Sequence, residues 1–438
     1  MKILLEKLVE GISVEPPSLT RRDVRLPHIP NKALAVIGMR RSGKSTFLWQ
    51  CLADRLAAGE PRVAQVYINF EDDRLGALGA PDLDRLLEAY FERQPEFRGS
   101  RRVGLFLDEI QLVSGWDRFA RRIMDSEKVD IFLSGSSAKL LSREVATALR
   151  GRALEVLVHP FSFREALAHV GALPKEGWSG LTGRGRSMVR AGFERYLESG
   201  GFPEAQGLSV EDRRALLRSY TDVAVLRDVI DRHQVANPTA LRWMQRHLLG
   251  NAAAKFSIEK FHATLHSQGL AVGKNTLHEY LGHLEDAFMI RVVSLDTGSE
   301  RKRMVNPRKA YPVDPALIPL FDRTGRANRG HLLETVVALE LERRGASVSY
   351  VKTPSGFEVD FLARFPDGKA TLIQVCTEVT DPDVFHREVR ALEDAKGAYP
   401  NVGRLLLIGE DVAPLDSPKG LRIQSVPEWL LGEEGKYI

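Results

Sequence analysis

The stretch Gly38-Met39-Arg40-Arg41-Ser42-Gly43-Lys44-Ser45-Thr46 decides the fold of the first part of this chain. It fits the pattern GxxxxGK[ST], follows the apolar run ALAVI and opens the helical pattern of residues 45–56. A glycine-rich loop lets consecutive backbone N–H groups point at phosphate oxygens, and the next helix adds the positive end of its dipole. The stretch therefore predicts a phosphate-binding loop between a buried strand and a helix.

This loop supplies the predicted contacts to a nucleoside triphosphate. Lys44 offers a compact cation for the β- and γ-phosphates of ATP, and the Ser45 hydroxyl is expected to ligate Mg²⁺. The residues expected to bind ATP are Gly38, Arg40, Arg41, Ser42, Gly43, Lys44, Ser45 and Thr46.

A second motif supports the first, because the apolar run VGLFL leads directly into Asp108 and Glu109. Asp108 is expected to hold Mg²⁺, mostly through water, since Mg²⁺ keeps much of its octahedral shell. Glu109 is expected to polarise the attacking water. P-loop kinases usually lack this adjacent glutamate, so its presence favours hydrolysis over transfer to a second substrate. The alternative is that two acids simply end a strand at the solvent.

Two further groups of residues are candidates for roles in hydrolysis. The run VDIFLSGSS carries Ser134 and Ser136, and such a hydroxyl can sense the γ-phosphate or hold the water, although serines also make turns. Arg150 and Arg152 flank a glycine, and either is a candidate arginine finger that neutralises charge on the transferred phosphate. A finger supplied by a neighbouring subunit would require at least a dimer. The alternative is an ordinary surface arginine.

The spacing of apolar runs divides the chain into four parts. Residues 1–30 are interpreted as an N-terminal arm and linker. In residues 31–165 short Val/Ile/Leu runs alternate with helical patterns, which predicts a parallel α/β sheet covered on both faces. Residues 166–325 have mainly helical periodicity, and residues 326–438 combine strand-like runs with two helices. We therefore expect a P-loop domain, a helical region and a second, small α/β domain.

Composition limits the setting in which this chain works. The net charge of +4 permits contact with nucleic acid without demonstrating it. Only Cys51 and Cys376 are present, which excludes a disulfide framework and indicates a reducing compartment. No run of about 18 apolar residues exists to span a bilayer, and the first residues make a poor signal peptide. The expectation is a cytoplasmic protein with no membrane partner.

Six segments together resemble the AAA-type P-loop ATPases of the archaeal and bacterial clade that carry a C-terminal uncharacterised domain. They are GMRRSGKST (38–46), YINFEDDRL (67–75), LFLDEIQLVSGWDRF (105–119), IFLSGSSAKLL (131–141), LRGRALEVLVHPFSFREAL (149–167) and GGFPEA (200–205). The resemblance implies a P-loop core with an additional strand. It further implies that the strand bearing Asp108 lies between the strand that precedes residues 38–46, the Walker A motif, and the neighbours of that strand. It also implies that Glu109 is catalytic, Ser134 is the sensor and Arg152 is the better finger candidate.

Residues 250–312 have the pattern of a winged helix: helix, turn at Gly269, second helix, then strand. The second helix begins with Lys274, Asn275, Thr276 and His278, where recognition helices reach bases or phosphates of DNA. A basic wing is expected from Arg301, Lys302, Arg303, Arg308 and Lys309. The alternative is a packing or partner surface, because winged helices also serve that purpose in ATPases.

The last domain resembles the PD-(D/E)xK nuclease fold through Glu334, Glu358 and Asp360. In that pattern carboxylates hold Mg²⁺ and a lysine activates water. Gln374 and Cys376 stand where an acid and the lysine are expected, and Lys369 and Lys352 are the candidates to replace the lysine. An active nuclease is therefore disfavoured. Three functions remain open: an ATPase coupled to DNA or to a conformational switch, a nucleotide-gated DNA nuclease, and a signalling ATPase with protein partners.

Overall fold

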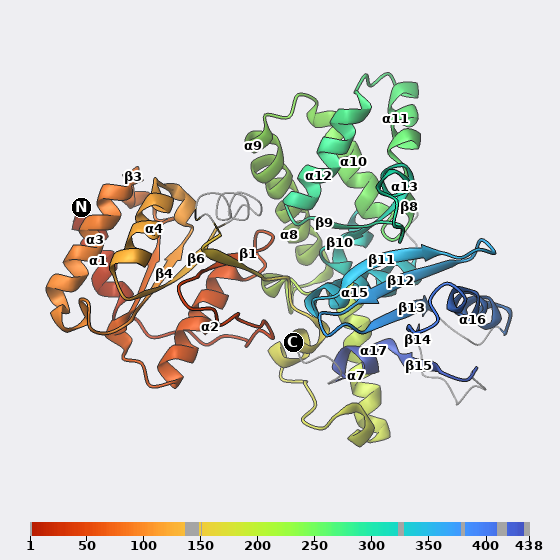
Figure 1. The fold of residues 1–438 in the computed structure, drawn as a ribbon, viewed down its shortest axis with the longest axis horizontal. Coiled ribbons are helices and arrows are strands. Elements are labelled where there is room, and N and C mark those ends of the chain that lie inside the picture. Colours follow the sequence, from red (N-terminus) through yellow and green to blue (C-terminus); the bar gives the residue numbers. More distant parts are fainter. Residues whose placement is uncertain are drawn as a thin grey trace. The chain divides into compact units, whose positions relative to one another are not determined.

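The computed structural model describes residues 2–135, 149, 151–322, 328–377, 382–409 and 418–432 (Figure 1). Ser136 and Arg150, two candidates from the sequence, lie outside these residues. The chain divides into two compact units, Met1–His159 and Pro160–Ile438. Within the described ranges, no helix combines the length and the apolar composition needed to cross a membrane.

The first unit is built on a sheet of five parallel strands in the order β2-β4-β6-β1-β7. These are β1 Ala33–Ile37, β2 Gln65–Asn69, β4 Val103–Asp108, β6 Val129–Ser134 and β7 Ala153–Leu157. All five coincide with apolar runs that predicted buried parallel strands. One expectation is wrong: β6, which carries Ser134, pairs with β1, and the Asp108 strand β4 lies one strand farther out. The additional strand of this core is therefore β6.

Helices cover both faces of this sheet because successive side chains of a strand point to opposite faces. Phe106 of β4 faces a core with Phe47, Leu48 and Cys51 of the helix that follows β1. Leu105 faces the opposite side, toward the other three helices. The helices are α1 Lys2–Gly11, α2 Lys44–Ala57, α3 Ala80–Arg93 and α4 Trp116–Ser126. The unit also contains a two-stranded parallel sheet, formed by β3 Leu78–Gly79 and β5 Val113–Ser114.

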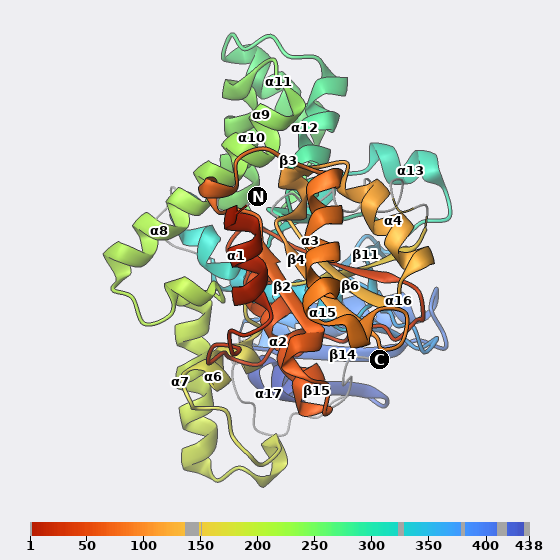
Figure 2. The same cartoon turned by 90° about the vertical axis from the view of Figure 1, so that its left-hand side faces the viewer.

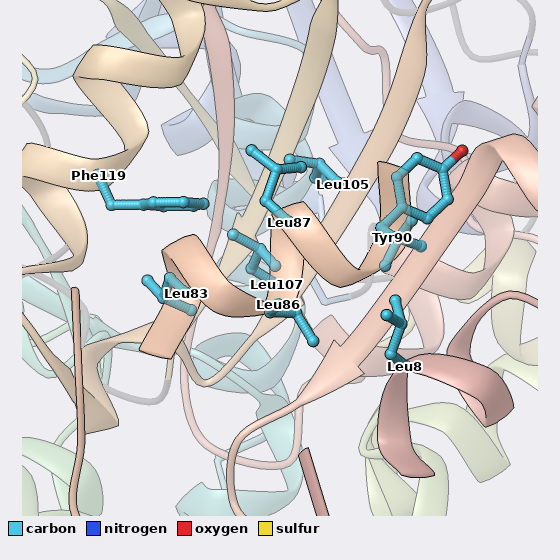
Figure 3. Close-up of a pocket in the computed structure, with 9 residues that line it drawn as sticks. Leu8, Leu83, Leu86, Leu87, Tyr90, Leu105, Leu107 and Phe119 are labelled. Carbon is cyan, nitrogen blue, oxygen red and sulfur yellow. The ribbon is translucent and has the colours of Figure 1, made fainter. Parts of the chain in front are cut away.

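The interpretation of residues 1–30 as a linker is wrong for their first part. Lys2–Gly11 forms α1, which packs beside α3 and against β2 (Figure 2). Leu8 of α1 enters a small apolar pocket with leucines of α3 and β4 and with Phe119 (Figure 3). Leu4 and Leu8 are spaced one helical turn apart, and this spacing indicates a helix with one apolar face. The helix therefore belongs to the core of the first unit.

The second unit begins with helices and then forms a sheet of three antiparallel strands in the order β8-β10-β9. The helices of this part are α6 Phe163–His169, α7 Gly183–Ser199, α8 Val210–Val223, the π-helix η8 Ala224–Ile230, α9 Asp231–His233, α10 Pro238–Gly250, α11 Ile258–Ser267, α12 Lys274–Asp286, α13 Glu300–Val305 and α14 Ile318–Phe321. The strands are β8 Lys255–Phe256, β9 Ile290–Val293 and β10 Arg308–Pro312. The predicted helical character of this region is present.

A five-stranded sheet completes the second unit in the order β11-β12-β13-β14-β15, with its first two pairings antiparallel and the last two parallel. The strands are β11 Ser347–Lys352, β12 Glu358–Arg364, β13 Ala370–Cys376, β14 Gly403–Ile408 and β15 Leu421–Ser425. Helices α15 Arg329–Arg343 and α17 Val426–Leu431 pack on one face, and α16 Pro382–Lys396 packs on the other. This is the separate α/β domain that the sequence predicted.

Candidate functional site

The predicted phosphate-binding loop lies between β1 and α2, and its backbone needs the glycines that the pattern supplies. Gly38 has φ +148° and Gly43 has φ +98°, both in the region that favours glycine. A Cβ atom on Gly38 would lie 2.2 Å from the carbonyl oxygen of Val158. Both a positive φ and a close neighbouring chain therefore exclude larger residues at Gly38.

Lys44 is buried and its ammonium group points back over the loop. Its Nζ donates hydrogen bonds to the carbonyl oxygens of Gly38, at 3.2 Å, and of Met39, at 3.0 Å. The Ser42 hydroxyl is also buried, and it has no hydrogen-bond partner among the described residues. A buried cation and an unpartnered hydroxyl in one loop suit an anionic ligand, because a buried polar group without a partner is costly.

Arg22 of the N-terminal arm braces this loop, a role that the sequence did not indicate. Its guanidinium donates to the carbonyl oxygen of Ser42 at 2.9 Å and to that of His159. Its backbone is held by Gln50 of α2, whose amide accepts from the Arg22 N–H at 2.7 Å and donates to the Arg22 carbonyl at 3.1 Å. The side chain is 4% exposed. Arg22 thus joins the arm, the loop and α2.

Asp108 lies fully buried at the carboxyl end of β4. Its Oδ2 accepts a hydrogen bond of 2.7 Å from the Tyr67 hydroxyl, and its Oδ1 accepts one from the Ser134 hydroxyl. The Tyr67 ring stacks on Trp49 of α2 with centroids 4.0 Å apart. Burial, with the nearby Asp108 charge, raises the pKa of Tyr67, so the phenol stays a hydrogen-bond donor. Tyr67 begins the segment 67–75 quoted above, but neither its contact with Asp108 nor a role for Trp49 could be predicted from the sequence.

Glu109 follows Asp108 in the left-handed backbone region, with φ +56°. Its backbone N–H donates to the Ser134 hydroxyl at 3.2 Å, and its carboxylate accepts from the Gln111 amide. Such strain in a residue with a Cβ is uncommon and is typical of functional positions. Ser134 therefore fixes Asp108 through its hydroxyl hydrogen and Glu109 through its oxygen.

The strand register places the loop 38–46 and the pair Asp108 and Glu109 at the same edge of the sheet, where the carboxyl ends of its parallel strands lie. Ser134 is level with Val36 of β1, and Leu133 is level with Leu107 of β4. Only β6 lies between β1 and β4, so their backbones are about 10 Å apart. That distance accommodates phosphates and a metal ion between the loop and Asp108. The residue types at this edge fit ATP and Mg²⁺.

Arg152 does not lie at this edge. Its carbonyl accepts from Ala33 at the start of β1, so it lies at the amino end of the sheet. Its guanidinium pairs with Asp125 at 2.6 Å, and that carboxylate raises the pKa of Arg152. Within one subunit Arg152 therefore cannot reach phosphates bound by the loop at Gly38. A role as a finger requires a second subunit.

Comparison with known proteins identifies the first unit. The AAA domain family matches residues 30–167, and a domain of unknown function matches residues 190–325. An uncharacterized protein of Methanocaldococcus jannaschii, MJ1544, is 32% identical over 401 residues, which cover 90% of this chain and 86% of the relative. This chain belongs to the same family as MJ1544 and carries an AAA domain. The AAA domain supports an ATPase role for this chain.

A bacterial protein is also similar to this chain. An uncharacterized protein of Haemophilus influenzae is 28% identical over 397 residues, covering 90% of this chain and 93% of that one. Among solved structures, the Walker-type ATPase PABY2304 of Pyrococcus abyssi covers 73% of this chain and 95% of its own, with 15% identity and a TM-score of 0.41.

Beyond the AAA domain, the predicted DNA-contacting residues lie mostly at the surface. Lys274, Asn275 and His278 are exposed on α12, and Thr276 is half-buried. Lys274 is paired with Glu259 of α11. Arg301, Lys302 and Arg303 are exposed on the short helix α13, whereas Arg308 is half-buried. The sequence grouped Lys309 with them, and that assignment is wrong, because Lys309 is 3% exposed.

Lys309 points from β10 into a cluster of three carboxylates. Its Nζ lies 2.7 Å from Glu334 Oε1, 3.0 Å from Glu358 Oε1 and 3.0 Å from Asp360 Oδ1. Desolvation lowers the pKa of Lys309, but the three carboxylates outweigh it and raise that pKa. Burial and the charge of Asp360 raise the pKa of Glu334. The lysine that lies beside the three acids is thus Lys309, whereas Lys369 and Lys352 are exposed.

Gln374, which stands where an acid is expected, uses its side chain for other hydrogen bonds. Its carbonyl oxygen accepts from the Asp360 backbone N–H at 3.2 Å, and its amide donates to Glu388 at 2.7 Å. Asp360 Oδ2 accepts from the Val375 N–H at 3.1 Å. No group of three or more His, Cys, Asp or Glu side chains suited to a metal ion occurs in the described part of the chain. A lysine ammonium fills the centre of this cluster.

Proposed function

We propose that the AAA domain hydrolyses ATP in a Mg²⁺-dependent reaction at the edge formed by the loop 38–46 and Asp108. The observation that carries this proposal is the shared contact of Ser134 with the Asp108 carboxylate and the Glu109 N–H. One hydroxyl thereby fixes the metal-binding acid and the acid that polarises water. Such positioning is what phosphoryl transfer asks of a protein.

Each residue has a distinct part in the reaction. The loop amides and Lys44 hold the triphosphate, and Ser45 and Asp108 would hold Mg²⁺. Mg²⁺ held there would offset the negative charge of the phosphates. Glu109 takes the proton of the attacking water as the water adds to the γ-phosphorus and the bond to ADP breaks. Release of phosphate from ATP with Mg²⁺, and its loss in EDTA, tests the metal requirement.

We propose further that Arg152 acts in trans as the arginine finger of an oligomer. Its position at the opposite end of the sheet leaves it available to a neighbouring subunit. The variants Arg152→Ala and Lys44→Ala should each be inactive alone, and their mixture should regain part of the activity. A mixture without activity, or an active Arg152→Ala variant, would reject the proposal.

A winged helix at residues 250–312 is the proposed route of coupling to duplex DNA. Support comes from the order β8-α11-α12-β9-α13-β10 with the sheet order β8-β10-β9, and from exposed basic residues on α12 and α13. Helix α12 would enter the major groove with Lys274 and Asn275, and Arg301, Lys302 and Arg303 would contact phosphates. Duplex DNA should raise the rate of ATP hydrolysis, and Arg301→Glu should reduce that effect.

We propose that the C-terminal α/β domain does not cleave DNA. The support is Lys309, which lies where the carboxylates would otherwise hold a metal ion. Incubation of the full chain with DNA and Mg²⁺ or Mn²⁺ should leave the DNA intact. Metal-dependent cleavage that disappears in Asp360→Ala would establish the alternative, a nucleotide-gated nuclease.

A further inference from the structure

A cavity of about 860 Å³ lies in the helical part of the second unit, on elements that the proposed duplex contact does not use. Helix α8 contributes Arg218, and α10 contributes Trp243, Gln245 and Arg246. Lys260 of α11 also lines it. This volume falls in the range of about 300–1,000 Å³ that is typical of ligand sites.

The cavity carries an excess of positive charge. Its lining holds five basic residues, Arg218, Arg242, Arg246, Lys255 and Lys260, against two acids, Asp222 and Asp322. Arg242 lies 3.7 Å from Asp222, and Lys255 is paired with Glu358. Arg218, Arg246 and Lys260 have no carboxylate partner among the described residues. Three cations thus remain available to an anionic ligand.

Gln245 gives an independent sign of a ligand. It is 2% exposed and lines the cavity, yet its amide Nε2 has no hydrogen-bond partner among the described residues. A buried donor without a partner costs about 1–3 kcal/mol. An acceptor on a ligand in the cavity would remove that cost. Surface cations alone would not explain this buried amide.

Aromatic rings are a third feature of this cavity. Trp243 is 38% exposed at the cavity, whereas most large apolar side chains are buried. Phe256 and Phe261 also line it, and their rings lie 5.6 Å and 5.4 Å from the ring of His247. An exposed indole next to cations offers a base a flat surface on which to stack.

We propose that this cavity binds a short segment of single-stranded nucleic acid. Arg218, Arg246 and Lys260 meet the phosphates, Trp243 stacks on a base, and the Gln245 amide donates to a base acceptor. A duplex buries the faces of its bases, so it cannot stack on Trp243. An acidic protein segment would satisfy the cations but would use neither the indole nor the buried amide.

Anisotropy of a fluorescein-labelled oligo(dT), titrated with the full chain, tests this site directly. Trp243→Ala and Arg246→Glu should each weaken binding about ten-fold, and Trp243→Phe should keep most of it, because stacking needs a ring. Gln245→Leu should also weaken binding. Thermal melts of each variant confirm that it is folded.

A labelled duplex separates this site from the proposed duplex contact on α12 and α13. Arg301→Glu should weaken binding of the duplex and leave oligo(dT) binding unchanged, and Arg246→Glu should do the reverse. Oligo(dT) that fails to bind, or binds Trp243→Ala as tightly as the unaltered chain, would overturn the proposal. Displacement of oligo(dT) by poly-glutamate at equal affinity would overturn it in favour of an acidic protein partner.

Discussion

The ammonium nitrogen of Lys309 lies 2.7 Å from Oε1 of Glu334 and thereby joins β10 to α15. Tyr311, two residues along the same strand, donates to the same oxygen at 2.7 Å. Glu334 therefore receives two hydrogen bonds from β10. A cation supplied by the chain thus lies among these acids.

Replacing Lys309 with methionine should expose the metal site that the lysine fills. The three acids would then lack their cation, so the free energy of unfolding should fall by about 3–5 kcal/mol. Mn²⁺ should restore part of that loss by binding the carboxylates, which a thermal melt with and without Mn²⁺ would show. Lys255→Met is the matched control, because Lys255 pairs with Glu358 from an exposed position. A Mn²⁺ effect in the unaltered chain that Asp360→Asn removes would contradict this account.

Arg22→Met should weaken nucleotide binding although Arg22 touches no part of the predicted ligand. Loss of its hydrogen bonds to Ser42 and His159 frees the phosphate-binding loop, so the Kd for ATP should rise about ten-fold. Isothermal titration of ATP measures this change. Arg21→Met is the control, since Arg21 pairs with Asp54 at the surface and should have no effect. Equal effects of both variants would mean that Arg22 does not position the loop.

Tyr67→Phe should raise the concentration of Mg²⁺ that half-saturates ATP hydrolysis. The lost hydrogen bond to Asp108 Oδ2 normally orients the carboxylate, and a bond to a charged group contributes about 1.5–3 kcal/mol. A shift of about ten-fold or more in the Mg²⁺ dependence is expected. Tyr90→Phe, which loses only a bond to the Val63 carbonyl, should keep the original dependence. An unchanged Mg²⁺ requirement in Tyr67→Phe would reject this role.

Asp314 should make the chain less stable as pH rises from about 4 to 6. Burial raises its pKa to about 6, although backbone N–H groups of Gly201 and Ala316 donate to it. Below pH 3.8 the carboxyl is protonated in the folded and the unfolded states. Between 3.8 and 6 only the unfolded state releases the proton, which lowers the free energy of unfolding by about 3 kcal/mol. Urea unfolding at several pH values should show this decline, and Asp314→Asn should lack it.

The sequence predicted those parts of the site that depend on local pattern. Gly38, Gly43 and Lys44 belong to one short loop whose spacing follows from phosphate binding, and Asp108 ends an unbroken apolar strand. Glu334, Glu358 and Asp360 were also recognised as one group. In each case the chemistry needs fixed residue types at fixed positions, so the sequence alone carries the signal.

Contacts between distant segments could not be predicted in the same way. Arg22 reaches His159, and Lys309 reaches Asp360, only after folding. The stretch with Arg301 and Lys309 contains five basic residues of equal appearance. Lys309 nevertheless points inward, on the same side of β10 as Tyr311, and both contact Glu334. The order of β4 and β6 likewise depends on sheet pairing. A single sequence does not reveal such pairings.

ATP turnover by the unaltered chain and by Glu109→Gln tests the central claim most directly. With Mg²⁺ present both proteins should bind ATP, and turnover should fall at least about a hundred-fold in Glu109→Gln, because the water loses its base. If the unaltered chain does not hydrolyse ATP, or if Glu109→Gln hydrolyses it equally fast, the proposed site is wrong.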